Sequence, residues 1–265
     1  MTPMLISGVK LCVIVPITKM AGRLEPLKTW LPEAVESEMG VLLIHDIRDE
    51  ETSFELHELM RETQYSKVQL VEQEFGDQGT ARNFGILHTS SEWVVFWDAD
   101  DVPEPRSVMR AVDNANQEID LIVGQYRINN QETKILGGKP TYRWNDLPRS
   151  LGLWRMAFRR EALGVAQFPA IRMAEDQIFF VRTITSIRKI EFSPELFYTY
   201  TVGGSNQITR NKDALKVLPL AISMMFHEFK KIRRIRNRRF VLNLLLRLIS
   251  TNFKRNYFWK FHASK

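Results

Sequence analysis

Short apolar runs alternate with longer amphipathic segments through the first hundred residues of the chain. Short runs rich in β-branched residues predict buried strands, and the longer segments predict helices between them. The pattern predicts strands at residues 11–16, 41–44, 67–71 and 93–97, and helices at residues 24–38, 54–63 and 81–88. This alternation predicts an α/β fold with a mostly parallel central sheet flanked by helices.

The pattern changes beyond residue 120. Apolar segments at residues 121–127 and 153–159 enclose a polar stretch that contains glycine. This arrangement predicts added strands or a mixed sheet that forms a second half of the site.

Composition sets the size and the compartment that we expect. The chain has 265 residues and 44% hydrophobic content, which is enough for one substantial core and a small appendage. Cys12 is the single cysteine, so no disulfide framework exists and a reducing compartment fits best. Neither a signal peptide nor an apolar run of about 18 residues stands out. We therefore expect a cytoplasmic protein.

Charge divides the chain into an acidic body and a basic tail. Residues 212–265 carry 14 Lys and Arg against two acids, whereas residues 1–211 carry 23 against 29. We predict one domain over residues 1–211 and a helical, basic and amphipathic tail over residues 212–265.

The tail combines dense positive charge with apolar faces. Its basic cluster, residues 230–239, lies between apolar segments at residues 217–229 and 240–249. Such helices suit an anionic membrane interface, so residues 230–265 are predicted to bind a membrane surface. Two alternatives remain, packing of the apolar faces on the body and binding of nucleic acid. Aromatic residues spread through the tail favour the membrane, and we expect no nucleic-acid partner.

Three acids, Asp98, Asp100 and Asp101, follow directly on the strand predicted at residues 93–97. Open α/β sheets bind ligands at the carboxyl ends of their strands. Several carboxylates there repel one another unless a cation joins them, and Mg²⁺ or Mn²⁺ prefers oxygen ligands. The pattern indicates an ion that bridges the protein to a diphosphate. The alternative is a solvated acidic turn.

Further chemistry is expected at one helix start and one strand end. Glu175 and Asp176 open an apolar, helix-like run, where they either stabilise the helix dipole or supply a general base. Asp46 ends the second strand and either contacts a nucleotide base or caps a turn.

The segment that contains Gly79 and Arg82 opens another predicted helix, and a helix start favours anions. Arg82 either contacts a diphosphate or forms a surface ion pair with Asp77 or Glu74.

Five motifs in order resemble glycosyltransferase family 2. They are residues 13–16 (VIVP), 44–46 (IHD), 79–86 (GTARNFGI), 96–101 (FWDADD) and 175–180 (EDQIFF). The resemblance spans residues 11 to about 210. It implies the GT-A fold for residues 1–211, and an inverting enzyme that uses nucleotide-diphosphate sugars.

The resemblance also implies a role for each residue on the donor side. Asp46 accepts a hydrogen bond from a uracil-type ring nitrogen, which favours a UDP-sugar. Asp100 is the direct metal ligand and Asp98 assists it or contacts the ribose, whereas Asp101 caps or orients the turn. The remaining residues of the nucleotide-sugar site are Pro16, Thr18, Gly79 and Arg82.

On the acceptor side, the resemblance implies that Asp176 is the general base and that Glu175 orients the loop or binds the acceptor. Trp144 and Ser205 are the predicted acceptor contacts, and Trp154 is predicted to lie in the core. The Gln-x-x-Arg-Trp motif of processive synthases is missing, which argues for transfer of a single sugar.

These features predict a metal-assisted glycosyltransferase of cell-surface polysaccharide or lipopolysaccharide biosynthesis, associated with the inner face of the plasma membrane. Its acceptor is a glycan or a lipid-linked molecule. One alternative is a sugar nucleotidyltransferase, for which residues 17–23 make a poor phosphate loop. The other is a non-catalytic module that binds membranes or polyanions.

Overall fold

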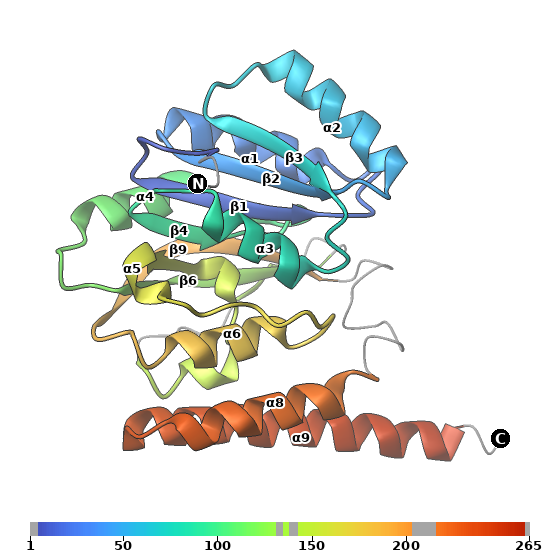
Figure 1. Cartoon of the computed structure of the whole chain (residues 1–265), viewed down its shortest axis with the longest axis vertical. Coiled ribbons are helices and arrows are strands. Elements are labelled where there is room, and N and C mark those ends of the chain that lie inside the picture. The colour runs from blue at the N-terminus through green and yellow to red at the C-terminus, as the bar shows by residue number, and fades with distance from the viewer. Residues whose placement is uncertain (1–4, 131–134, 138–142, 203–215, 263–265) are drawn as a thin grey trace.

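The structure, a computed structural model, describes residues 5–130, 135–137, 143–202 and 216–262. Within these ranges all strands join one sheet, in the order β3-β2-β1-β4-β8-β6-β9-β5, with β7 paired to β6 (Figure 1). The strands are β1 (Leu11–Ile17), β2 (Gly40–Asp46), β3 (Val68–Gln73), β4 (Trp93–Phe96), β5 (Val102–Pro103), β6 (Leu121–Asn130), β7 (Ile135–Gly137), β8 (Met156–Arg159) and β9 (Ile190–Val202).

Helices cover both faces of this sheet and form one further layer at its edge (Figure 1). The helices are α1 (Glu25–Glu36), α2 (Glu50–Thr63), α3 (Gln78–Leu87), α4 (Pro105–Asn114), α5 (Arg160–Leu163), α6 (Glu175–Thr183), α8 (Leu218–Lys231) and α9 (Ile235–His262), with 3-10 turns η1 (Leu147–Arg149) and η2 (Leu153–Arg155).

The first half of the sheet is parallel, as the strand and helix pattern predicts. Strands β3, β2, β1 and β4 pair in parallel, and Val13 lies opposite both Val41 and Val95. The second half is mixed, because β8 runs antiparallel to β4 and β6 while β6 and β9 are parallel. Both expectations for the sheet are therefore confirmed.

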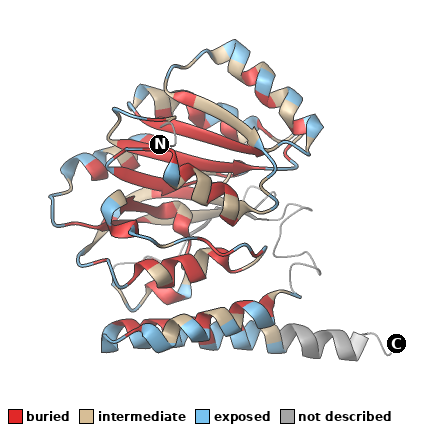
Figure 2. Cartoon of the chain, viewed as in Figure 1, coloured by how far each residue is buried: buried red, intermediate tan, exposed pale blue. Residues whose placement is uncertain are grey.

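Alternating side chains of the strands supply two apolar cores, one on each face. In β1, Cys12 and Ile14 join the core under α3 and α6, while Leu11, Val13 and Val15 join the core under α1, α2 and α4. Figure 2 shows the resulting band of buried residues along the strands. The two-residue period of a strand thus places alternate side chains in opposite layers.

Two elements differ from the sequence expectations. The chain forms a strand over β9, which the apolar pattern did not predict, and residues 153–155 form a 3-10 turn instead of a strand. The pairing of β9 with β6 shifts in register around Gln125. These shifts interrupt the alternation of inward and outward side chains, which explains why the apolar pattern did not predict the strand.

The basic tail packs on the body through α8 and α9, which lie side by side next to α6 (Figure 1). Met225 of α8 and Phe240 and Leu244 of α9 are buried in the same core as Phe180 of α6. The inner face of the tail therefore packs on the body, as one of the two alternatives for the tail predicted. Within the described residues, no helix combines the length and apolarity needed to span a bilayer.

Candidate active site

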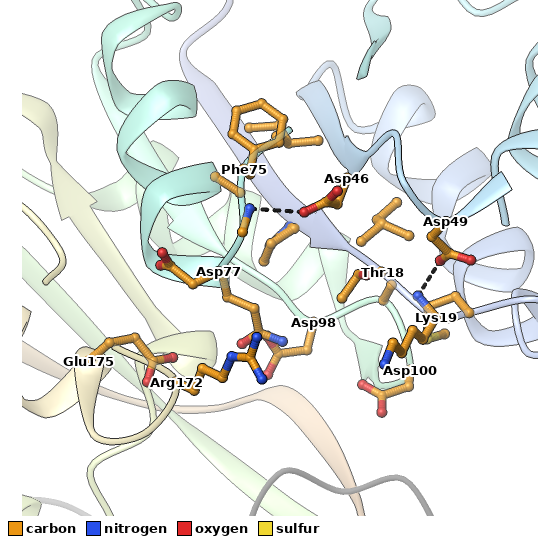
Figure 3. Close-up of a pocket in the computed structure, with 18 of the residues that line it drawn as sticks. Thr18, Lys19, Asp46, Asp49, Phe75, Asp77, Asp98, Asp100, Arg172 and Glu175 are labelled. Atoms are coloured by element: carbon orange, nitrogen blue, oxygen red, sulfur yellow. Dashed lines mark hydrogen bonds between the residues drawn. The ribbon is translucent and has the colours of Figure 1, made fainter. Parts of the chain in front are cut away.

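A cavity of about 640 Å³ opens at the carboxyl ends of β1, β2 and β4. Figure 3 shows acidic and basic side chains from separate elements turned toward it. Six of the predicted site residues line this cavity: Pro16, Thr18, Asp46, Asp98, Asp100 and Glu175. The parallel strands bring them together because their carboxyl ends meet at one edge of the sheet.

Asp46 ends β2 and is held as a carboxylate. Its Oδ1 and Oδ2 accept hydrogen bonds from Nε and Nη2 of Arg48 at 2.8 and 2.5 Å, and Oδ2 accepts one from the Gly76 amide at 2.9 Å. The bonds from Arg48 lower the pKa of Asp46 well below its ordinary value. Asp46 therefore presents a fixed acceptor at the wall of the cavity.

Arg82 joins the two acidic parts of the site. Its guanidinium donates to Oδ1 of Asp98 at 2.9 Å and to Oε1 of Glu175 at 3.1 Å. The Arg82 side chain is only 8% exposed, so these ion pairs are shielded from water. The alternative, a surface ion pair with Asp77 or Glu74, is wrong, since Arg82 bridges residues that lie 16 and 93 positions away. The predicted contact of Arg82 with a diphosphate stays a prediction.

Asp101 is buried and anchors the acidic turn to β9. Its carboxyl group accepts hydrogen bonds from the Tyr198 hydroxyl at 3.0 Å and from the Thr201 amide at 2.7 Å. The same hydroxyl accepts a hydrogen bond from the Asp98 amide at 3.1 Å. Burial, then the charge of Asp98, raise the pKa of Asp101 to about 8. Asp101 thus orients the turn, and it lines the cavity together with Asp98 and Asp100.

Asp176 lies in the first turn of α6, directly after Glu175. Ala174 precedes them with a left-handed backbone, φ 65°, and this turn starts the helix beside the cavity. Asp176 is half-buried, and Oδ1 accepts a hydrogen bond from the Gln177 amide at 2.7 Å. Desolvation, then the charge of Glu175, raise the pKa of Asp176 to about 7. A carboxyl group with such a pKa exchanges protons near neutral pH.

Basic side chains that the sequence analysis missed also line the cavity: Lys19, Arg23, Arg48 and Arg172. In Figure 3 the Arg172 side chain extends into the cavity beside Asp98. Irregular segments carry all four residues, where no periodicity marks a side chain as inward. Positive charge from several directions suits a bound diphosphate.

Three backbone amides of the loop after β1 already donate to side chains of the protein. The amides of Lys19, Met20 and Gly22 donate to Asp49, Thr52 and Glu55, with distances of 2.8 and 2.7 Å for the latter two bonds. A phosphate loop requires such N–H groups to face the ligand. This arrangement counts against a nucleotidyltransferase.

Four of the predicted site residues, Gly79, Arg82, Trp144 and Asp176, are not among those that line the cavity. Gly79 is in the first turn of α3, where an added Cβ would lie 2.8 Å from the Pro169 carbonyl oxygen, so its small size serves the packing of that loop. Trp144 packs between Phe180 and Phe240, with ring centroids 6.5 and 4.6 Å away. Ser205 lies outside the described residues. Trp154, predicted to lie in the core, is half-buried at its border, where it stacks on Tyr198 and Tyr200.

Comparison with known sequences identifies the family of the chain. The family described as "Glycosyl transferase family 2" matches residues 31–177, which is more than half of the chain. The chain belongs to glycosyltransferase family 2. The family 2 match covers the segment from α1 to the start of α6, so it includes the acidic turn and both Glu175 and Asp176.

Known relatives of this family 2 chain are distant. It is 23% identical over 175 residues to "Putative glycosyltransferase EpsH" of Bacillus subtilis (strain 168), over 59% of this chain and 51% of that protein. The chain thus spans about half the length of the curated relative it matches.

Solved structures share its fold. S. aureus TarS 1-349, in complex with UDP-GlcNAc, superposes with a TM-score of 0.67 at 18% identity, over 91% of this chain and 73% of that one. Mannosyltransferase PcManGT from Pyrobaculum calidifontis, in complex with GDP-Man and Mn²⁺, gives 0.64 at 16% identity, over 88% and 68%. The predicted family and the predicted GT-A fold are confirmed.

Proposed function

We propose that this family 2 chain transfers a single sugar, with inversion, from a UDP-sugar to a hydroxyl group of a glycan or lipid-linked acceptor. The supporting observation is the cavity that unites Asp46, the pair Asp98 and Asp100, and Glu175 at the start of α6. In this proposal Asp46 lies at the nucleotide base, Asp98 and Asp100 lie at the diphosphate, and Glu175 lies at the acceptor. The complexes of TarS with UDP-GlcNAc and of PcManGT with GDP-Man support a nucleotide-sugar donor.

Asp98 and Asp100 fit a divalent cation. Both line the cavity, and at Asp98 the guanidinium of Arg82 donates to Oδ1 and not to Oδ2. Desolvation, then the charge of Asp98, raise the pKa of Asp100. The two carboxylates therefore repel each other, and a bound cation would offset that repulsion. Among the described residues no three His, Cys, Asp or Glu side chains form a ready metal cluster. That suits Mg²⁺ or Mn²⁺, which often takes one or two carboxylates and completes its shell with substrate phosphates and water.

The proposed reaction divides the work among residues of this chain. Asp46 binds the base, while Arg23 and Arg172 attract the diphosphate. Asp176 takes the proton from the acceptor hydroxyl as its oxygen bonds to the anomeric carbon and the bond to the diphosphate breaks. When bound, the cation offsets the negative charge that develops on the departing UDP.

Donor binding should depend on Asp100. With Mn²⁺ present, UDP and UDP-sugars are expected to raise the Tm of the protein more than GDP or dTDP compounds do. In Asp100→Ala, or with a chelator, calorimetry should show UDP affinity reduced about tenfold or more. Glu118→Ala, which removes an exposed acid paired with Lys189, is the control. Equal UDP affinity with and without Mn²⁺ would refute the metal role.

Activity should rise with pH through about 7. Since the folded protein raises the pKa of Asp176 to about 7, the carboxyl group is protonated below that pH and cannot accept a proton. Rates of UDP release, measured from pH 5.5 to 8.5 at saturating Mn²⁺, should fall on the acidic side. A flat profile would exclude Asp176 as the rate-determining base.

We further propose a role in cell-surface polysaccharide or lipopolysaccharide biosynthesis at the inner face of the plasma membrane. The similarity to EpsH supports a glycosyltransferase role. A lipid-linked acceptor would require the cavity to lie close to a bilayer.

A further inference from the structure

The exposed apolar side chains of this protein gather on the tail. Of the eleven large hydrophobic side chains that are exposed among the described residues, seven lie on α8 and α9. Five of the seven form a stripe on α9: Ile235, Leu242, Leu246, Ile249 and Phe253. We call these five residues the outer stripe.

The outer stripe follows the helical repeat. Its members are 7, 4, 3 and 4 residues apart, so they share one side of α9 over about 27 Å. The opposite side of α9 is already used, because Phe240, Val241 and Leu244 are buried against the body. A helix that is apolar on two sides is normally covered on both. Within the part of the chain that the structure describes, the outer stripe stays 42–70% exposed, so we look for a partner that covers it.

The part of the tail that carries the outer stripe is strongly basic. Residues 216–253 contain nine Lys and Arg but one acid, Glu228, which pairs with Arg182 at 3.2 Å and with Lys231 at 3.0 Å. A second copy of this chain would bring like charges together across the stripe. An anionic lipid surface would instead complement them.

A polar groove of about 340 Å³ runs beside the stripe, between α9 and η1. Arg149 and Arg247 face it, together with amide and hydroxyl side chains, and Leu246 of the outer stripe forms part of its wall. The lining contains no acid. Such a groove has the chemistry to bind a phosphate whose hydrocarbon attachment lies against Leu246.

We propose that the outer face of α9 docks on an anionic lipid bilayer. The outer stripe enters the interface, and Arg149 and Arg247 bind lipid phosphates in the groove. α9 extends along the molecule toward the side where the carboxyl ends of β1 and β2 lie, as Figure 1 shows. Docking through this face would hold the cavity beside the membrane, where a lipid-linked acceptor resides. This proposal concerns a surface outside the cavity, so it stands independently of the sugar-transfer reaction.

Vesicle sedimentation tests the proposal with the full chain. The wild-type protein should sediment with vesicles of phosphatidylcholine and phosphatidylglycerol, but not with phosphatidylcholine alone, and salt should weaken the binding. Leu242→Ser/Leu246→Ser should lower the partition coefficient at least tenfold. Arg149→Gln/Arg247→Gln should lower it roughly 30-fold, or about fivefold for each charge.

Matched variants on α2, α3 and α4, outside the tail, serve as controls. Phe54→Ser and Leu87→Ser remove side chains that are 67% and 57% exposed, and Arg61→Gln/Arg106→Gln removes two exposed charges. All should sediment like the wild type. Circular dichroism and Tm verify folding, and UDP affinity should stay unchanged in every variant.

Two results would overturn the proposal. The first is equal sedimentation of wild type and both tail variants. The second is a wild-type dimer in solution that Leu246→Glu converts to a monomer without change in vesicle binding, which would assign the outer stripe to contacts between copies. A wild-type protein that binds the vesicles but transfers no sugar would count against the proposed reaction and not against the docking surface.

Discussion

Asp176→Asn is expected to lower kcat by about 10²- to 10⁴-fold while UDP affinity in Mn²⁺ stays within twofold of wild type. The amide has the size of the carboxyl group but cannot accept the proton of the attacking hydroxyl. Asp176 lies in α6 next to Glu175, whereas the residues proposed to bind the donor lie on the strand ends and the loops that follow them. The loss should therefore fall on the chemical step. Coupled detection of UDP release measures kcat, and calorimetry measures the affinity.

A matched change elsewhere separates this effect from a general loss of charge. Asp113 lies in α4 and pairs with Lys10 at 2.9 Å on the surface, so Asp113→Asn should leave kcat unchanged. Full activity of Asp176→Asn would show that another group takes the proton. Loss of UDP affinity together with kcat would instead place Asp176 in the donor site.

Arg82→Met is expected to cost about 3 kcal/mol in the free energy of unfolding and to abolish most activity. The substitution removes the cation that Asp98 and Glu175 share, and it leaves both carboxylates desolvated without a partner. Arg82 also lowers the pKa of Asp176 against the larger effects of desolvation and Glu175. Without Arg82, any residual activity should rise at a higher pH than in the wild type. Urea unfolding measures the first effect, and the pH profile of UDP release measures the last.

A double variant distinguishes a stabilising ion pair from a positioning one. Arg82→Met/Glu175→Gln removes one of the two abandoned charges, so it should recover part of the lost stability. It should not recover activity, because Asp98 and the start of α6 remain unlinked. Arg82→Lys keeps the charge but loses the fork that reaches both acids, and it should be intermediate in both measurements. Wild-type stability of Arg82→Met would show that the two ion pairs contribute nothing to the fold.

Strong local patterns made the donor side predictable. The strands that precede Asp46 and Asp98 are nearly continuous apolar runs, and their carboxyl ends must meet in a parallel sheet. The same reasoning did not reach Arg23 or Arg172, because irregular segments carry no periodicity. The same reasoning also did not predict that Arg82 contacts Glu175, because the two residues are 93 positions apart and no local pattern connects them.

The sequence by itself determined the parallel half of the sheet, the acidic turn at the end of β4, the family and the charged tail. Each of these features depends on residues that are close together in the sequence, through their periodicity, a motif or their net charge. Only the tertiary structure decided that Arg82 links Asp98 to Glu175, that Tyr198 and Asp101 hold the acidic turn, and that α9 buries one side and exposes the outer stripe on another. Such contacts join segments far apart in the chain, and their existence depends on how the layers pack.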